Sequence, residues 1–151
     1  MQHKWHYQDE SERRKWQNPE SILKRIGLKT GQTLVDIGCG EGFFALPAAR
    51  IVGRAGLIYA GDISTEALET LQRKAEIEKL ENILISAGAA EELTMCEGCA
   101  DIVFMPIAIF KAGNQHSSCT LAGCMNKCVV IDINADMRER VAVGIKENQI
   151  A

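Results

Sequence analysis

The residues best suited to chemistry form a glycine-rich segment that follows an apolar run. The run LVDI passes directly into GCGEGFF, so that Asp36 precedes three alternate glycines, Gly38, Gly40 and Gly42. Glycines allow a backbone to approach a ligand closely, and a helix that starts directly after them presents unpaired N–H groups. The segment therefore predicts a binding site for a polar or charged ligand at the start of a helix.

The glycine spacing and Asp36 indicate which ligand class fits. Dinucleotide sites use G-x-G-x-x-G to hold a pyrophosphate, whereas this chain has G-x-G-x-G. A carboxylate at Asp36 would repel a pyrophosphate, but it suits the cationic amino-acid end of S-adenosylmethionine, directly or through water. The pattern favours this sulfonium cofactor, and an NAD-dependent oxidoreductase stays a lesser alternative.

A second carboxylate, Asp62, ends the next apolar run, GLIYAGD. At the end of a strand it could accept hydrogen bonds from both hydroxyls of a ribose. Alternatively, Asp62 and Ser64 only cap the helix that follows. Together with the glycine turn, the pattern favours ribose binding.

The elements that must position these residues alternate between strand and helix. Asn18, Pro19 and Glu20 predict a helix start, and this helix runs to about Ile26 and stops at Gly27. Five apolar runs predict strands at 33–37, 56–62, 82–86, 101–107 and 127–133, with helices at about 43–52 and 65–80. Near-continuous apolar runs are typical of buried parallel strands. We therefore expect an α/β, Rossmann-like, doubly wound and mostly parallel sheet of five or six strands, with helices on both faces.

The rest of the chain is less regular. Residues 1–18 read as an extended arm with about one helical turn. Its Trp5, Tyr7 and Trp16 either cover the cofactor as a lid or fasten the arm to the core. A long helix over 111–126 is doubtful because of its glycines. Residues 134–151 leave room for one more strand at most. We expect one domain over 1–151, because the chain is too short for two domains of ordinary size.

Composition excludes several classes of protein. The 151 residues are 46% hydrophobic, enough for a core, and the net charge of -3 gives no indication of a nucleic-acid partner, although a local basic patch stays open. The sequence shows no signal peptide and no membrane-spanning run, which predicts a cytoplasmic protein without a membrane partner. A small-molecule substrate is expected, and self-association into a homo-oligomer stays open.

Six cysteines raise the question of a metal. Cys96 and Cys99 form a CxxC pair that could ligate zinc with Cys119, Cys124 or Cys128, but the second half of the pattern fits poorly. Incidental reduced thiols are favoured over a zinc site or a redox function, so no metal is predicted. His3, His6 and His116 belong to no recognisable constellation.

These motifs resemble the class I S-adenosylmethionine-dependent methyltransferases, in particular small archaeal and bacterial members of the methyltransferase type 11 kind. The resemblance covers about residues 3–133, through HKWHY, SERRKWQNPESILKRIGLKTGQ, VDIGCGEGFF, GDIS and AGAAEELTMCEGCADIVFM. It implies contacts to the methionine end, the ribose, the adenine and the reacting methyl. The implied cofactor-binding residues, with those derived above, are Tyr7, Asp36, Gly38, Cys39, Gly40, Gly42, Asp62, Ile63, Gly88, Ala89, Ala90 and Met105.

The chain also departs from the family pattern. Ala89 stands where relatives usually have an aspartate that touches the adenine amino group, a loss of about 1 to 3 kcal/mol of binding if nothing replaces it. Phe110 and Lys111 replace a stretch that often holds a histidine, and the C-terminal part is short. We expect methyl transfer to an unidentified small molecule by in-line displacement, with no catalytic residue assigned. The alternative is a non-catalytic module that only binds the cofactor or a partner.

Overall fold

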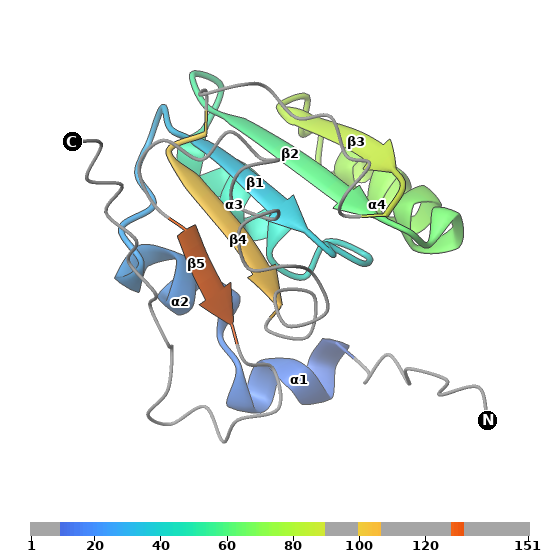
Figure 1. Cartoon of the computed structure of the whole chain (residues 1–151), viewed down its shortest axis with the longest axis horizontal. Helices are drawn as coiled ribbons and strands as arrows, with labels where there is room; N and C mark the ends of the chain where they lie inside the picture. Colours follow the sequence, from blue (N-terminus) through green and yellow to red (C-terminus); the bar gives the residue numbers. More distant parts are fainter. Residues whose placement is uncertain (1–9, 90–99, 107–127, 132–151) are drawn as a thin grey trace.

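The computed structural model describes residues 10–89, 100–106 and 128–131, which form a parallel α/β sheet with flanking helices (Figure 1). The strands are β1 (Thr33–Ile37), β2 (Leu57–Asp62), β3 (Ile83–Ala87), β4 (Ile102–Pro106) and β5 (Cys128–Ile131). The helices are α1 (Glu10–Trp16), α2 (Pro19–Arg25), α3 (Ala45–Val52) and α4 (Thr65–Ile77).

The sheet has the strand order β3-β2-β1-β4-β5, and every neighbouring pair is parallel. The chain moves outward from β1 through α3, β2 and α4 to β3, and then returns to the other side of β1 as β4. Right-handed crossovers in one direction place α3 and α4 on the same face of the sheet, and Figure 1 shows both behind it. The strand order reverses between β1 and β4, where such sheets bind ligands at the carboxyl ends of their strands.

Local signals explain where two helices begin and end. The Asn18 side chain accepts a hydrogen bond from the Ser21 N–H and caps α2, as predicted. At the other end Gly27 adopts φ +92°, and the Leu28 N–H donates to the Leu23 carbonyl. This left-handed glycine ends the helix where the sequence predicted.

Three predictions about the helices were wrong. The helix α4 stops at Ile77 instead of Leu80, because Lys79 turns left-handed at φ +55° and the Leu80 N–H returns to the Ala75 carbonyl. The helix α3 starts at Ala45, since the glycine turn extends through Phe44. The arm carries the two-turn helix α1, where an extended arm with about one turn was expected.

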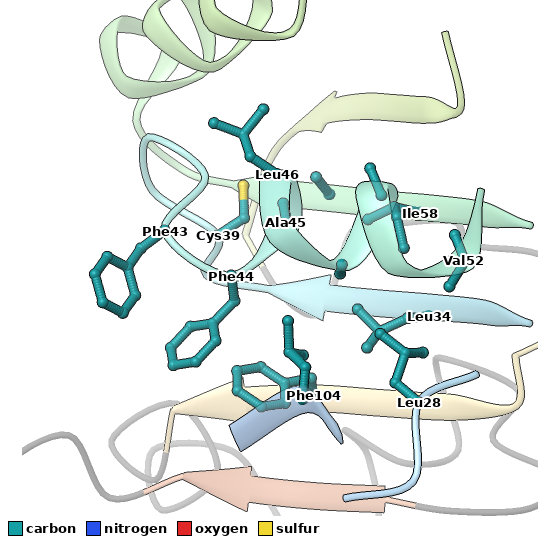
Figure 2. Packing of buried hydrophobic residues seen from close by; sticks show 14 of the residues in the cluster. Leu28, Leu34, Cys39, Phe43, Phe44, Ala45, Leu46, Val52, Ile58 and Phe104 are labelled. Atoms are coloured by element: carbon teal, nitrogen blue, oxygen red, sulfur yellow. The ribbon is translucent and has the colours of Figure 1, made fainter. Parts of the chain in front are cut away.

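The core lies between the sheet and the helices α2, α3 and α4. Leu34 of β1, Ile58 of β2, and Leu71 of α4 are fully shielded from solvent. The ring of Phe44 packs on Phe104 of β4, with 4.6 Å between ring centroids (Figure 2). The glycine turn is therefore anchored by the aromatic residue that follows it.

Two side chains connect distant segments at the amino-terminal edge of the sheet. Asp101 accepts a hydrogen bond from the Thr33 N–H at 2.8 Å, and its own N–H donates to the Thr33 carbonyl. Asn82 donates to the carbonyls of Ala49 and Gly53, both at 2.9 Å, and so covers the carboxyl end of α3. These bonds fix β1 against β4, and α3 against the start of β3.

Several expectations concern residues outside this description. Helices on the second face, a sixth strand, the arm before Glu10, the segment 111–126 and the segment 134–151 all lie outside the described residues, wholly or mainly. Among the helices that are described, none is long and apolar enough to cross a membrane.

Candidate cofactor site

The glycine turn between β1 and α3 is built on left-handed backbone. Gly38, Gly40 and Gly42 have φ values of +75°, +55° and +94°. Residues with side chains avoid this region, so the alternation of glycines is a requirement of the turn itself. A Cβ on Gly42 would also lie 2.4 Å from Cδ1 of Leu71, which packs beneath the turn.

The N–H groups at the start of the turn are bound to β2. Those of Gly38 and Cys39 donate to the Gly61 carbonyl at 2.8 and 3.0 Å, and that of Gly40 donates to Oδ2 of Asp62 at 2.8 Å. The sequence predicted close approach of a ligand to this backbone. The structure adds that these three N–H groups hold the turn against the end of the neighbouring strand.

The Asp62 carboxylate accepts hydrogen bonds from two loops. Its Oδ2 accepts the bond from Gly40, and its Oδ1 accepts one from the Ser64 N–H at 2.8 Å. Ser64 in turn caps α4 by accepting from the Ala67 N–H. The structure thus contains the capping hydrogen bonds that the alternative interpretation of Asp62 and Ser64 predicted. It does not exclude ribose binding, because each carboxylate oxygen has a second lone pair.

Asp36 is the buried acid of the site. Its side chain lies on β1 beside the turn, its residue is only 2% exposed, and its Oδ2 has no hydrogen-bond partner within the described part of the chain. Desolvation, together with the negative charge of Asp62, raises the pKa of Asp36 to about 7, while the positive charge of Arg13 opposes this rise. A buried carboxylate oxygen without a donor is costly, which makes it a marker of function.

Arg13 of α1 lies at the same turn, and the sequence analysis did not identify it. Its guanidinium carbon is 3.8 Å from the centroid of the Phe43 ring, and its Nε donates to Oε1 of Gln17 at 2.6 Å. Desolvation lowers the pKa of Arg13, and the charges of Asp36 and Glu10 partly offset this. The acids and bases spaced three and four residues apart in ESERRKW are compatible with a helix, but only the fold shows what that helix covers.

The helix α1 is fastened at this position by a lysine of α4. Lys74 lies 3.1 Å from a carboxylate oxygen of Glu10 in α1 and 3.5 Å from one of Glu41 in the glycine turn. Glu10 also pairs with Arg14 along the helix. Together with the stacking of Arg13 on Phe43, these contacts explain why the arm forms two helical turns beside the site.

Other predicted residues lie along the same edge of the sheet. Ile63 follows Asp62 and is 76% exposed, which is unusual for a large apolar side chain. The Gly88 N–H donates to the Asp62 carbonyl, so the end of β3 lies beside the end of β2, and Ala89 follows directly. Met105 belongs to β4. Tyr7, Ala90 and the side chain of Met105 lie outside the described residues.

Cys39 is the one glycine-turn residue with an ionisable thiol. It is 6% exposed, and desolvation, with the charges of Asp36 and Asp62, raises the pKa of the thiol above its usual range. A thiol in this state is a weak nucleophile and a poor metal ligand. Within the described ranges no group of three or more histidine, cysteine or acidic side chains could hold a metal. Cys96, Cys99, Cys119 and Cys124 fall outside them.

Comparison with known proteins gives one family. Residues 28–140 match the model of a family described as "Methyltransferase domain". A probable cobalt-precorrin-6B C(15)-methyltransferase (decarboxylating) of Methanosarcina mazei is 34% identical over 112 residues, 72% of this chain and 59% of that protein. A 2-phytyl-1,4-naphtoquinone methyltransferase of Trichormus variabilis is 42% identical over 57 residues, 38% of this chain and 25% of that one.

Solved structures show the same fold. A SAM-dependent methyltransferase from Aquifex aeolicus superposes with a TM-score of 0.68 over 83% of this chain and 73% of that one, at 23% identity. The Rossmann-like α/β class is therefore confirmed. The chain spans only about a quarter to three fifths of the two curated relatives, so their whole activities do not transfer directly.

Proposed function

This chain belongs to the methyltransferase domain family, and on that premise we propose that it binds S-adenosylmethionine and transfers its methyl group to a small molecule. One observation carries the proposal: Asp36 is buried at the turn and has an oxygen that receives no hydrogen bond from any described residue. The ammonium of the cofactor's amino-acid end supplies the donor and the positive charge that this oxygen lacks.

The remaining residues fit the rest of the cofactor. Asp62 keeps a lone pair on each oxygen for the ribose hydroxyls, and the exposed side chain of Ile63 offers an apolar surface for the adenine. Gly88 and Ala89, at the end of β3, would edge the adenine pocket. Ala89 brings no side-chain hydrogen bond to the adenine, so we propose that shape and stacking hold the base.

The cofactor supplies an already activated methyl group on a sulfonium sulfur. The chain's own residues therefore need to bind, orient and exclude water, rather than to provide an acid or a base. Asp36 would fix the amino-acid end, Asp62 would fix the ribose, and the braced glycine turn would keep these two carboxylates at a constant separation. No catalytic residue is required for the step, and we assign none.

The acceptor class is a proposal drawn from the relatives. Those that match this chain include proteins named as methyltransferases of a cobalt-precorrin, a phytyl-naphthoquinone and aklanonic acid, all small organic molecules. We propose a small organic acceptor here as well. A cytoplasmic location, one domain over the whole chain and self-association remain predictions of the sequence.

A thermal melt with S-adenosylhomocysteine, the demethylated product, tests the proposal. At 100 times its Kd, a ligand that binds only the folded protein adds about 2.7 kcal/mol, or roughly 5 to 11 °C for a chain of this size. We expect Asp62→Ala to weaken binding about 10-fold or more. Glu66→Ala, which removes an exposed charge from the first turn of α4, serves as the control and should bind like wild type.

Two outcomes would count against the proposal. A shift with NADH but none with S-adenosylhomocysteine would restore the dinucleotide interpretation. The melting temperature could also rise with S-adenosylhomocysteine while a metabolite screen finds no methyl acceptor. That outcome would favour the non-catalytic module, an alternative that the missing adenine contact at Ala89 also supports.

A further inference from the structure

Two opposite charges at the site lack an ion-pair partner among the residues that the structure describes. Asp36 has an unpartnered oxygen, and Arg13 forms no ion pair within 4.0 Å with any described acid. The neighbouring cations differ: Arg14 pairs with Glu10 and Glu20, and Lys74 pairs with Glu10 and Glu41. Arg13 and Asp36 are near enough to shift each other's pKa, yet they make no hydrogen bond to each other.

The guanidinium of Arg13 is held ready for an anion. One edge is fixed by the bond from Nε to Gln17, whose side chain is buried, and one face lies on the Phe43 ring. The terminal Nη groups make no hydrogen bond to a described residue. A partly desolvated guanidinium with this fork available is well suited to a carboxylate, which it binds through two parallel bonds.

We propose that Arg13 is a specificity-determining residue that binds the α-carboxylate of the cofactor, while Asp36 binds its α-ammonium. The two charges of an amino-acid zwitterion sit on one carbon, so a ligand of this class would satisfy both unpaired groups at once. This inference rests on the proposed function, because it concerns the amino-acid end of the same cofactor.

The role has a consequence for ligand selection. A ligand that keeps the adenosine, the sulfur and the ammonium, but lacks the carboxylate, would leave Arg13 without its anion and place a second cation beside it. The wild-type protein should therefore discriminate strongly between S-adenosylhomocysteine and its decarboxylated analogue. A cation that only holds α1 against the rings would give no such discrimination.

Calorimetric titration with these two ligands tests the proposal. Wild type should bind S-adenosylhomocysteine about 10- to 100-fold more tightly than decarboxylated S-adenosylhomocysteine. Arg13→Ala should lose this preference by weakening only the carboxylate-bearing ligand, and Arg13→Lys should keep part of it. Lys15→Ala, which removes an exposed positive charge from the same helix, should behave like wild type.

The possible outcomes distinguish failure of this proposal from failure of the proposed function. Equal weakening of both ligands in Arg13→Ala would overturn the proposal, since Arg13 would then maintain the pocket and contact no carboxylate. Unchanged affinity for S-adenosylhomocysteine in that variant would overturn it as well. Failure of the wild-type protein to bind either ligand would instead contradict the proposed function on which this inference rests.

Discussion

At the scale of single residues, Asp36 is placed where it costs stability. This carboxylate is 2% exposed, and one of its oxygens has no partner in the described part of the chain, so desolvation penalises its charge and the nearby charge of Asp62 increases the penalty. Arg13 compensates only in part. Natural proteins keep such groups mainly where a ligand supplies the missing hydrogen bond. The group then lowers the stability of the ligand-free protein and raises its affinity for the ligand.

The pKa of Asp36 predicts a pH-dependent stability. Because this pKa is raised to about 7 in the folded protein, between about pH 4 and pH 7 the folded state keeps a proton that the unfolded chain has released. The folded state therefore binds more protons in this window, and the free energy of unfolding falls as the pH rises. The loss is complete above pH 7 and amounts to roughly a few kcal/mol.

Replacing Asp36 by Asn should remove this dependence. Urea unfolding at pH 8 should show Asp36→Asn to be more stable than wild type, and the two proteins should be nearly equal at pH 5. The buried amide carries no charge, so its stability should change less between the two pH values. Parallel pH profiles of both proteins would contradict a raised pKa at Asp36.

At the scale of the elements, the glycine turn and α4 depend on each other. Leu71 is fully buried and occupies the space beneath Gly42, while Lys74 of the same helix reaches Glu41 in the turn. The turn is thus held from below by packing, and from β2 by the bonds to Gly61 and Asp62. Substitutions in the turn should therefore lower the stability of the fold as well as weaken ligand binding.

A comparison of Gly42 with Gly31 distinguishes the energetic cost of backbone strain from that of a steric clash. Gly42 and Gly31 have similar φ values of +94° and +83°, but a Cβ on Gly42 would meet Leu71 at 2.4 Å, whereas nothing lies within 4 Å of one on Gly31. Gly31→Ala should cost about 1 to 2 kcal/mol from strain alone. Gly42→Ala should cost about 1 to 3 kcal/mol more, because the core must yield. Equal losses in denaturant titrations would show that the core relaxes around the methyl group.

At the scale of the whole molecule, the layers are joined by bonds between segments far apart in the sequence. Asn82 enters β3 and holds the carboxyl end of α3 through two carbonyls, those of Ala49 and Gly53. Removal of the amide would take one donor from each carbonyl and leave each with one backbone donor, the Gly53 N–H for Ala49 and the Gly56 N–H for Gly53. We expect Asn82→Ala to lower the free energy of unfolding by about 1 to 3 kcal/mol.

Chemical denaturation at neutral pH measures this loss, with Glu81→Ala as the control. Glu81 is the exposed neighbour of Asn82, so its replacement should change stability by less than about 0.5 kcal/mol. If both variants were equally stable, the bonds of Asn82 would contribute nothing beyond their exchange with water.

The sequence by itself determined the elements whose signals are local. The cap at Asn18, the stop at Gly27 and the apolar runs of β1 to β5 predicted most boundaries, because capping and strand burial depend on a few neighbouring residues. The alternation of Gly38, Gly40 and Gly42 was equally readable, since left-handed backbone selects glycine directly. Family and fold class followed from these residues.

Only the tertiary structure decided what surrounds the site. Nothing local marks Arg13 as a neighbour of Asp36, because the two come together only when α1 packs against Phe43. The bond from the Gly40 N–H to Asp62 requires β1 and β2 to be paired in register, whereas the bond from the Ser64 N–H to Asp62 is local. The pairs Arg13 and Asp36, and Gly40 and Asp62, are each more than twenty positions apart, and their energies depend on burial and distance, which no spacing in the sequence expresses.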